Sequence, residues 1–378
     1  MSPGGPGSKP AGLPGVYVSI PFCAQKCTYC NFRSDVYSRA LRAAYLRCLA
    51  REIRSAELPA AETLYFGGGS PSLLEPEEFT LLAEALPRQP WREATIEVAP
   101  GEATAQRVAA WSRAGITRAS FGVQSFVPEV ARAAGRKHDG AMVREEQARL
   151  AEAGIGSISV DLIAGLARQT WATWQRSLDW VEKLDPGHVS VYMLETDDAS
   201  RLGRELRSGG ARYGAGEVPS EALVLELYLC ALDRLRGLGY QRYEVSNFAR
   251  PGAESAHNAK YWRMQPYLGF GSDAHSFDGR LRWCNVPSAP EYVRRLGDGG
   301  SARLTTERLD ANRLFEDRIL TGLRTREGVR CSTGEWARLQ ASAALLSERG
   351  WLAAEPPALR LTDSGLLFAD QAIAELLG

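Results

Sequence analysis

The stretch Cys23-Ala24-Gln25-Lys26-Cys27-Thr28-Tyr29-Cys30 places three thiols within eight residues, at the spacing C-x3-C-x2-C. It follows an apolar run, Val16 to Ile20, that predicts a β-strand ended by Pro21. Structural zinc usually takes four protein ligands in two separated pairs, and an iron–sulfur cubane usually takes four thiolates. Three thiols in one tight loop favour a cluster with one iron left open. Three ordinary cysteines and a zinc clip are the alternatives.

The stretch Tyr17-Val18-Ser19-Ile20-Pro21-Phe22-Cys23, continued by Cys27 and Cys30, resembles the radical S-adenosylmethionine superfamily. The resemblance implies that Cys23, Cys27 and Cys30 hold a 4Fe-4S cluster. It also implies that the open iron binds the amino and carboxylate groups of S-adenosylmethionine. One electron would then cleave this cofactor to a 5′-deoxyadenosyl radical, so an electron donor for the cluster is an implied partner.

Composition sets broad limits on the protein. Lys+Arg 45 balances Asp+Glu 45 over 378 residues, which leaves no electrostatic signature of nucleic-acid binding. No apolar run approaches the roughly eighteen residues of a membrane span. Seven cysteines, three of them in one loop, fit free thiols in a reducing compartment. We therefore expect a cytoplasmic protein without nucleic-acid partners; the sequence leaves open whether it forms a homodimer.

Strand patterns alternate with helix patterns through residue 194, which indicates parallel βαβ units with right-handed crossovers. Six such units predict an α/β fold, a partial (β/α)6 radical-SAM barrel open on one side. The predicted strands are 16–20, 63–66, 95–98, 117–123, 157–163 and 188–194, and the predicted helices are 38–57, 77–86, 105–114, 141–153 and 171–184.

The later part of the chain changes character. Residues 201–219 are polar and contain glycine, which marks a boundary. Ser332 and Glu335 form a capping-box pattern, and apolar triplets flank Glu355-Pro356-Pro357 like a small wing. Neutral charge favours a packing role over DNA binding. The predicted units are a disordered tail (1–15), a radical SAM core (16–200), a barrel extension (201–300) and a C-terminal helical, winged-helix-like domain (301–378).

Function in barrels of this kind gathers at the C-terminal ends of the strands. There Gly67-Gly68-Gly69 would let backbone amides approach a ligand carboxylate. The resemblance extends to the branch that contains the oxygen-independent coproporphyrinogen III oxidases. It implies that S-adenosylmethionine contacts Tyr17, Tyr29, Gly69, Ser70, Glu97, Gln124, Arg136 and Asp161. Arg136 could equally be a solvated surface charge.

Two functions compete within this branch, the radical oxidative decarboxylation of coproporphyrinogen III and haem chaperoning of the HemW type. The oxidases typically extend the motif to a fourth cysteine and have a longer N-terminal segment. Here Asn31-Phe32 follows Cys30, and only the loose tail precedes Tyr17. Both differences favour a haem chaperone that passes haem to apoproteins, with oxidase activity as the alternative.

The segment His257-Asn258-Ala259-Lys260-Tyr261-Trp262 resembles the H-N-x-x-Y-W stretch of the haem chaperones. If helical, it places His257 and Tyr261 on one face. The resemblance implies that His257 is an axial ligand of haem, since imidazole commonly holds haem iron. Asn258 or nearby backbone would fix the other ring nitrogen. The alternative is a short helix whose aromatic side chains pack at the mouth of the barrel.

Overall fold

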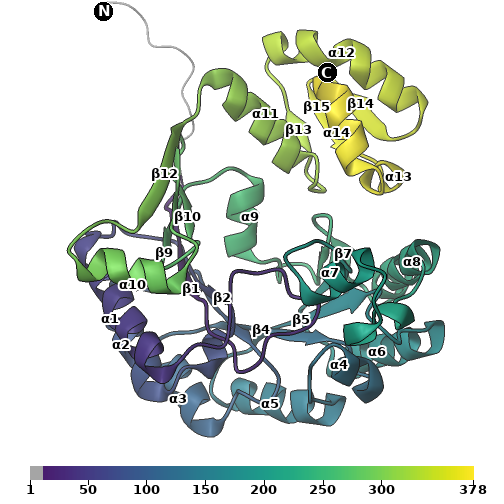
Figure 1. Cartoon of the computed structure of the whole chain (residues 1–378). Coiled ribbons are helices and arrows are strands. Elements are labelled where there is room, and N and C mark those ends of the chain that lie inside the picture. Colours follow the sequence, from purple (N-terminus) through teal and green to yellow (C-terminus); the bar gives the residue numbers. More distant parts are fainter. Residues whose placement is uncertain (1–11) are drawn as a thin grey trace, which may run out of the picture.

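A twelve-stranded sheet organises the computed structural model, which describes residues 12–378 (Figure 1). Most of the predicted tail lies outside the described residues. Six strands pair in parallel and in chain order, and they form the predicted partial barrel. These strands are β1 (Gly15–Ile20), β2 (Thr63–Gly68), β3 (Glu93–Val98), β4 (Arg118–Gln124), β5 (Ser157–Ala164) and β6 (His188–Met193).

Helices cover the outer face of this parallel sheet, because alternate side chains of each strand are apolar and point outward, as Val16, Val18 and Ile20 do. The sequence predicts all of these helices except α4. The helices are α1 (Arg39–Ser55), α2 (Pro76–Ala83), α3 (Ala105–Arg113), α4 (Pro128–Ala133), α5 (Gly140–Glu152) and α6 (Trp171–Leu184), with a short turn η1 (Pro71–Leu73) before α2.

The sheet grows beyond the parallel core at both edges. On one side β8 (Asn247–Ala249) and β7 (Gln241–Arg242) continue from β6. On the other side β9 (Tyr267–Phe270) pairs in parallel with β1. Antiparallel strands follow, β10 (His275–Phe277), β11 (Leu281–Asn285) and β12 (Arg303–Arg308), with helix α10 (Ala289–Gly297).

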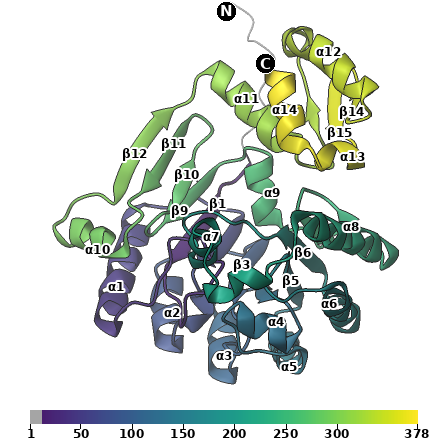
Figure 2. The same ribbon diagram turned by 45° about the vertical axis from the view of Figure 1, so that its right-hand side comes forward.

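The polar stretch 201–219 holds α7 (Arg201–Arg207) and η2 (Arg212–Glu217), and α8 (Glu221–Gly237) follows it. Helix α9 (Ala256–Trp262) lies between β8 and β9 in the chain. Strand β8 pairs with β6, and β9 pairs with β1. The helix therefore connects the two ends of the parallel core, and both views place it between the barrel and the C-terminal helices (Figure 2).

The C-terminal unit has its own hydrophobic cluster, which includes Phe315, Ile319, Leu339, Leu359 and Ile373. The capping box between Ser332 and Glu335 is present as predicted, and so is the wing, which is formed by β14 (Leu352–Glu355) and β15 (Ala358–Leu361). Strand β12 still belongs to the large sheet, so this unit begins after the proposed boundary at 301. Its elements are α11 (Ala311–Gly322), β13 (Val329–Arg330), α12 (Thr333–Glu348), β14 (Leu352–Glu355), β15 (Ala358–Leu361), α13 (Asp363–Leu366) and α14 (Ala369–Leu377).

Among residues 12–378, none of the helices combines the length and the apolar character that a membrane crossing requires.

Candidate functional site

The inner faces of the barrel strands are polar, in contrast to their outer faces. Side chains alternate along a strand, so every second residue points inward. Strand β3 presents Thr95 and Glu97, and β4 presents Arg118, Ser120 and Gln124. These residues line a cavity of about 540 Å³, within the size range of small-molecule sites.

Ten of the twelve residues predicted from the sequence line this one cavity. The structure brings together Cys23, Cys27, Cys30, Tyr29, Gly69, Ser70, Glu97, Gln124, Arg136 and Asp161. Tyr17 and His257 are not on its wall. Tyr17 instead stacks on Tyr65, with ring centroids 6.0 Å apart.

The cysteine loop is held in place by backbone hydrogen bonds to the segment that follows it and to α7. The Cys23 amide donates to the Asp35 carbonyl at 3.0 Å, and the Leu202 amide donates to the Thr28 carbonyl at 2.9 Å. All three thiols are half-buried and free. Burial raises the pKa of the Cys23 thiol. The loop is therefore anchored while its sulfur atoms stay available for a ligand.

These residues fit a cluster in donor type and number. Three soft thiol donors lie on one cavity wall, and cubane clusters are held by thiolates. Among residues 12–378, no three Cys, His, Asp or Glu side chains already have the mutual spacing of a metal site. The thiols would have to close around the iron, and Cys23, Cys27 and Cys30 are the residues that would hold it.

Arg136 is not the solvated surface charge that the sequence left as an alternative. Its Nε and Nη2 donate to the Tyr29 hydroxyl at 3.2 and 3.1 Å. Tyr29 belongs to the cysteine loop, so this contact ties the loop to the segment after α4 and places a cation on the cavity wall.

Two carboxyl groups face the cavity at the cysteine end. Burial, followed by the charge of Asp161, raises the pKa of Glu97 to about 7. Burial also raises the pKa of Asp161 to about 6. Glu97 accepts from the Tyr65 hydroxyl at 3.0 Å and from the Gly68 amide at 3.1 Å. Both acids can thus change protonation near neutral pH.

Gln124 ends β4 in a strained conformation. Its φ is 68°, in the left-handed region that a residue with a side chain rarely adopts. Its Oε1 is buried and has no hydrogen-bond partner among residues 12–378. Because a buried acceptor without a partner is costly, this amide is a candidate ligand contact.

The glycine triplet works differently from the prediction. The Gly69 amide donates to the Ile20 carbonyl at 2.7 Å, and the Ser70 amide donates to the Phe22 carbonyl at 2.7 Å. These amides are therefore occupied and do not offer themselves to a ligand carboxylate. Glycine is required at 69 because a Cβ there would lie 2.6 Å from the Phe22 carbonyl oxygen.

His257 shares a face of α9 with Tyr261, as predicted, but the helix lies beside the first residues of the strands. His257 is 1% exposed, and its Nδ1 lies 2.8 Å from Thr63 Oγ1, at the start of β2. Its Nε2 lies 2.8 Å from the Tyr261 hydroxyl. The expected partner Asn258 does not contact the ring and lines the cavity instead. In this conformation neither ring nitrogen is open to iron.

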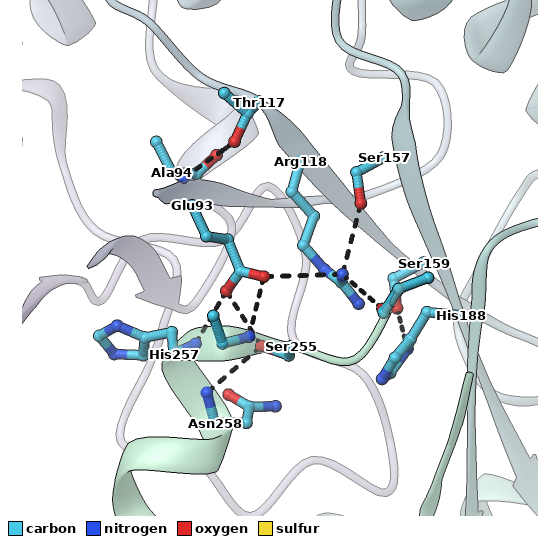
Figure 3. Close-up of polar contacts among 12 residues, drawn as sticks. Glu93, Ala94, Thr117, Arg118, Ser157, Ser159, His188, Ser255, His257 and Asn258 are labelled. Atoms are coloured by element: carbon cyan, nitrogen blue, oxygen red, sulfur yellow. Dashed lines mark hydrogen bonds and ion pairs between the residues drawn. The ribbon is translucent and has the colours of Figure 1, made fainter. Parts of the chain in front are cut away.

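The sequence analysis did not predict the polar residues that begin the barrel strands, at the end of the barrel beside α9. Arg118, His188 and Ser157 are the first residues of their strands, and Glu93 begins β3 (Figure 3). Glu93 accepts hydrogen bonds from the start of α9, which is how the helix is attached to the barrel. The available signal was a charged or polar residue opening an otherwise apolar strand.

The family model for the radical SAM superfamily matches residues 17–181. The haem chaperone HemW of Lactococcus lactis is 32% identical over 83% of this chain and 82% of its own length. HemW of Mycobacterium tuberculosis H37Rv is 31% identical over 96% of this chain and 95% of its own length. The chain belongs to the HemW family of radical SAM proteins.

Two further comparisons extend this HemW-family assignment. The mitochondrial radical S-adenosyl methionine domain-containing protein 1 of Bos taurus is 32% identical, over 98% of this chain and 88% of its own. Coproporphyrinogen III oxidase (HemN) from Escherichia coli superimposes with a TM-score of 0.83, covering 96% of this chain and 90% of that one. At 24% identity, the HemN structure establishes the fold alone.

Proposed function

We propose that this protein is a haem chaperone, which binds haem and transfers it to apoproteins. The observation that carries the proposal is the similarity to HemW haem chaperones over most of the chain, for example over 96% of it in Mycobacterium tuberculosis. Asn31 supports the choice over the oxidase. It stands beside the third thiol, and its side-chain amide donates to Asp197 Oδ2 at 2.9 Å, so it braces the loop.

The cluster and its cofactor belong to the same proposal. Cys23, Cys27 and Cys30 hold a 4Fe-4S cluster, which supplies one-electron chemistry when bound. Ser70, Glu97, Gln124, Arg136 and Asp161 form the wall against which S-adenosylmethionine binds, and Tyr29 and Gly69 lie on the same wall. The proposed partners are an electron donor for the cluster and the apoproteins that accept haem. The proposed oligomeric state is a homodimer. Seven free cysteines support a reducing, cytoplasmic location.

We assign haem ligation to His257 through Nε2. Burial, followed by the charge of Lys260, lowers the pKa of His257 to about 3, so the imidazole is neutral as a metal ligand must be. Thr63 can keep Nδ1 oriented, which is the usual role of a second hydrogen bond on a ligating histidine. The Tyr261 hydroxyl occupies Nε2 and has to give way.

Haem titration of three variants tests this assignment. We expect His257→Ala to lose most of the Soret-band shift. Tyr261→Phe should bind haem at least as tightly as wild type, because it removes the group that competes for Nε2. His275→Ala is the matched control, since His275 is an exposed histidine on β10. If His275→Ala loses haem and His257→Ala keeps it, the ligand assignment is wrong.

The same preparations should not convert coproporphyrinogen III when supplied with S-adenosylmethionine and a reductant under anaerobic conditions. Sustained turnover would replace the chaperone proposal with the oxidase.

A further inference from the structure

The guanidinium of Arg118 lies at the deep end of the barrel cavity with one nitrogen unused. Arg118 is 3% exposed. Its Nη1 donates to the Ala253 carbonyl at 3.0 Å and to Ser157 Oγ at 3.3 Å. Its Nη2 is buried and has no hydrogen-bond partner among residues 12–378. Figure 3 shows that the contacts drawn to this side chain all reach the other nitrogen.

The positive charge of Arg118 is only partly balanced. Its nearest carboxylate oxygen, on Glu93, lies 3.7 Å from Nη1. That carboxylate is committed elsewhere, because it accepts from Ser255 Oγ at 3.2 Å and from the amides of Ala256 and His257 at 3.0 and 2.9 Å. A buried cation with an incompletely shared counter-ion favours an additional anion.

Thr95 adds a second unused polar atom next to Arg118. The two residues are register partners on the neighbouring strands β3 and β4, and both line the cavity. Thr95 Oγ1 is also buried without a hydrogen-bond partner among residues 12–378. Buried polar groups are nearly always satisfied, so two adjacent exceptions facing one cavity indicate a missing ligand.

This pair lies away from the cysteine end of the cavity. Arg118 begins β4 and Gln124 ends it, and six residues of extended strand span about 20 Å between their α-carbons. The cysteine loop and Arg136 belong to the far end. Asn258 and Ser255, at the start of α9, line the near end.

We propose that Arg118 and Thr95 form a subsite for an alkyl carboxylate about the size of propionate. The two N–H groups of Nη2 and the Thr95 hydroxyl donate to the carboxylate oxygens, which suits the geometry of arginine recognition. The carboxylate has two chemical sources, a free small organic acid or a propionate arm of haem. Only the second source rests on the proposed function. Glu93 and Asp161 are nearby acids, so binding of a free probe is weak.

Propionate is the ligand used to test the subsite, and propionamide, which has the same size but no charge, is the control ligand. Saturation-transfer NMR on the full chain, with and without reconstituted cluster, should show saturable propionate binding and no propionamide binding. We expect Arg118→Gln to weaken propionate at least about fivefold and Thr95→Val about twofold, as loss of a charged and a neutral donor implies. Arg42→Gln is the control, because Arg42 pairs with Glu78 on the outer helices.

Thr95→Val keeps the test valid if Arg118→Gln does not fold, since it replaces only an unpartnered hydroxyl. The subsite is overturned if Thr95→Val and one Arg118 variant, either Arg118→Gln or Arg118→Lys, both bind propionate as tightly as wild type does. So does the lack of saturable binding in wild type.

Competition separates the two sources. If haem displaces propionate and haem dimethyl ester does not, the propionate arm occupies the subsite. If neither displaces propionate, the ligand is a free acid. Propionate binding in a protein that fails to bind haem would remove the chaperone proposal and leave the subsite standing.

Discussion

The cysteine end of the barrel and helix α9 use their polar side chains in opposite ways. At the cysteine end the thiols are half-buried and free, and Gln124 has an unpartnered buried oxygen. Where α9 closes the barrel, both ring nitrogens of His257 are bonded, and Lys260 donates to the Leu13 carbonyl and pairs with Glu62. The cysteine end therefore has free polar atoms that can bind a ligand. The contacts that attach α9 to the barrel, which we call the latch, are already satisfied.

The difference identifies where binding energy is available. An unsatisfied buried polar group costs about 1–3 kcal/mol, and a ligand that satisfies it recovers that energy. Arg118 and Thr95 carry such atoms into the depth of the cavity, beside the latch. The proposed haem ligation by His257 would instead have to open the hydrogen bonds that both ring nitrogens already make.

The largest effect is expected at the thiols. Alanine at Cys23, Cys27 or Cys30 should remove the iron of the anaerobically reconstituted cluster, because a third ligand is lost where no fourth exists in the loop. Cys48→Ala should keep full iron content, since Cys48 is on α1 and packs against the core. Iron and sulfide analysis measures both, and iron loss from Cys48→Ala equal to that from the loop variants would refute the three-ligand site.

A smaller effect is expected at the latch. Glu93→Gln leaves the Arg118 guanidinium without its counter-ion and weakens three hydrogen bonds to α9, so we expect roughly 3 kcal/mol of destabilisation. Hydrogen exchange of residues 256–262 should accelerate before that of the barrel strands. Glu75→Gln is the control, because its ion pair with Arg107 is at the surface. Unchanged exchange in α9 would show that Glu93 does not hold it.

A change of pH is expected to alter the free energy of unfolding by as much as Glu93→Gln does, or by less. The pKa of Glu97 is raised to about 7, so the folded state holds this proton more tightly than the unfolded chain does. Its contribution to stability is complete below about pH 4.5 and falls as the pH rises through 7. The loss is at most about 3 kcal/mol, because the carboxyl faces a cavity open to water. Glu97→Gln should flatten this slope in urea unfolding between pH 5 and 8, and an unchanged slope would rule the group out.

The smallest effect is expected at Thr95. Valine has a similar shape and lacks the unpartnered hydroxyl, so Thr95→Val should raise the free energy of unfolding by up to about 1 kcal/mol without ligand. Ser159→Ala is the comparison, because Ser159 is bonded to His188 and its loss should destabilise. Destabilisation by Thr95→Val would mean that its hydroxyl already has a partner.

The sequence predicted the parallel core well because its strands are short, β-rich runs separated by helices of regular period. Ten of the twelve predicted site residues also lie in one cavity, since all parallel strands end on one side. The prediction failed where contacts link distant segments. Nothing in the local pattern shows that Glu93 holds α9 or that Gly69 is fixed by the Phe22 carbonyl.

The i, i+4 spacing correctly predicted that His257 and Tyr261 share one helical face, but it did not predict the surroundings of His257. The Nδ1 atom of His257 is occupied by Thr63, which is 194 residues away in the chain. Gly15 makes room for the ring, because a Cβ there would lie 3.1 Å from His257 Nδ1. Such tertiary constraints have no signature in local periodicity.

Haem transfer is the most direct test of the account. The cluster-reconstituted protein, loaded with haem and freed of excess, should be mixed with an apo-haem protein. We expect the Soret band of the acceptor to appear at a rate that depends on His257, while coproporphyrinogen III in the same mixture stays unconverted. An acceptor that remains free of haem, or conversion of the porphyrinogen, would contradict it.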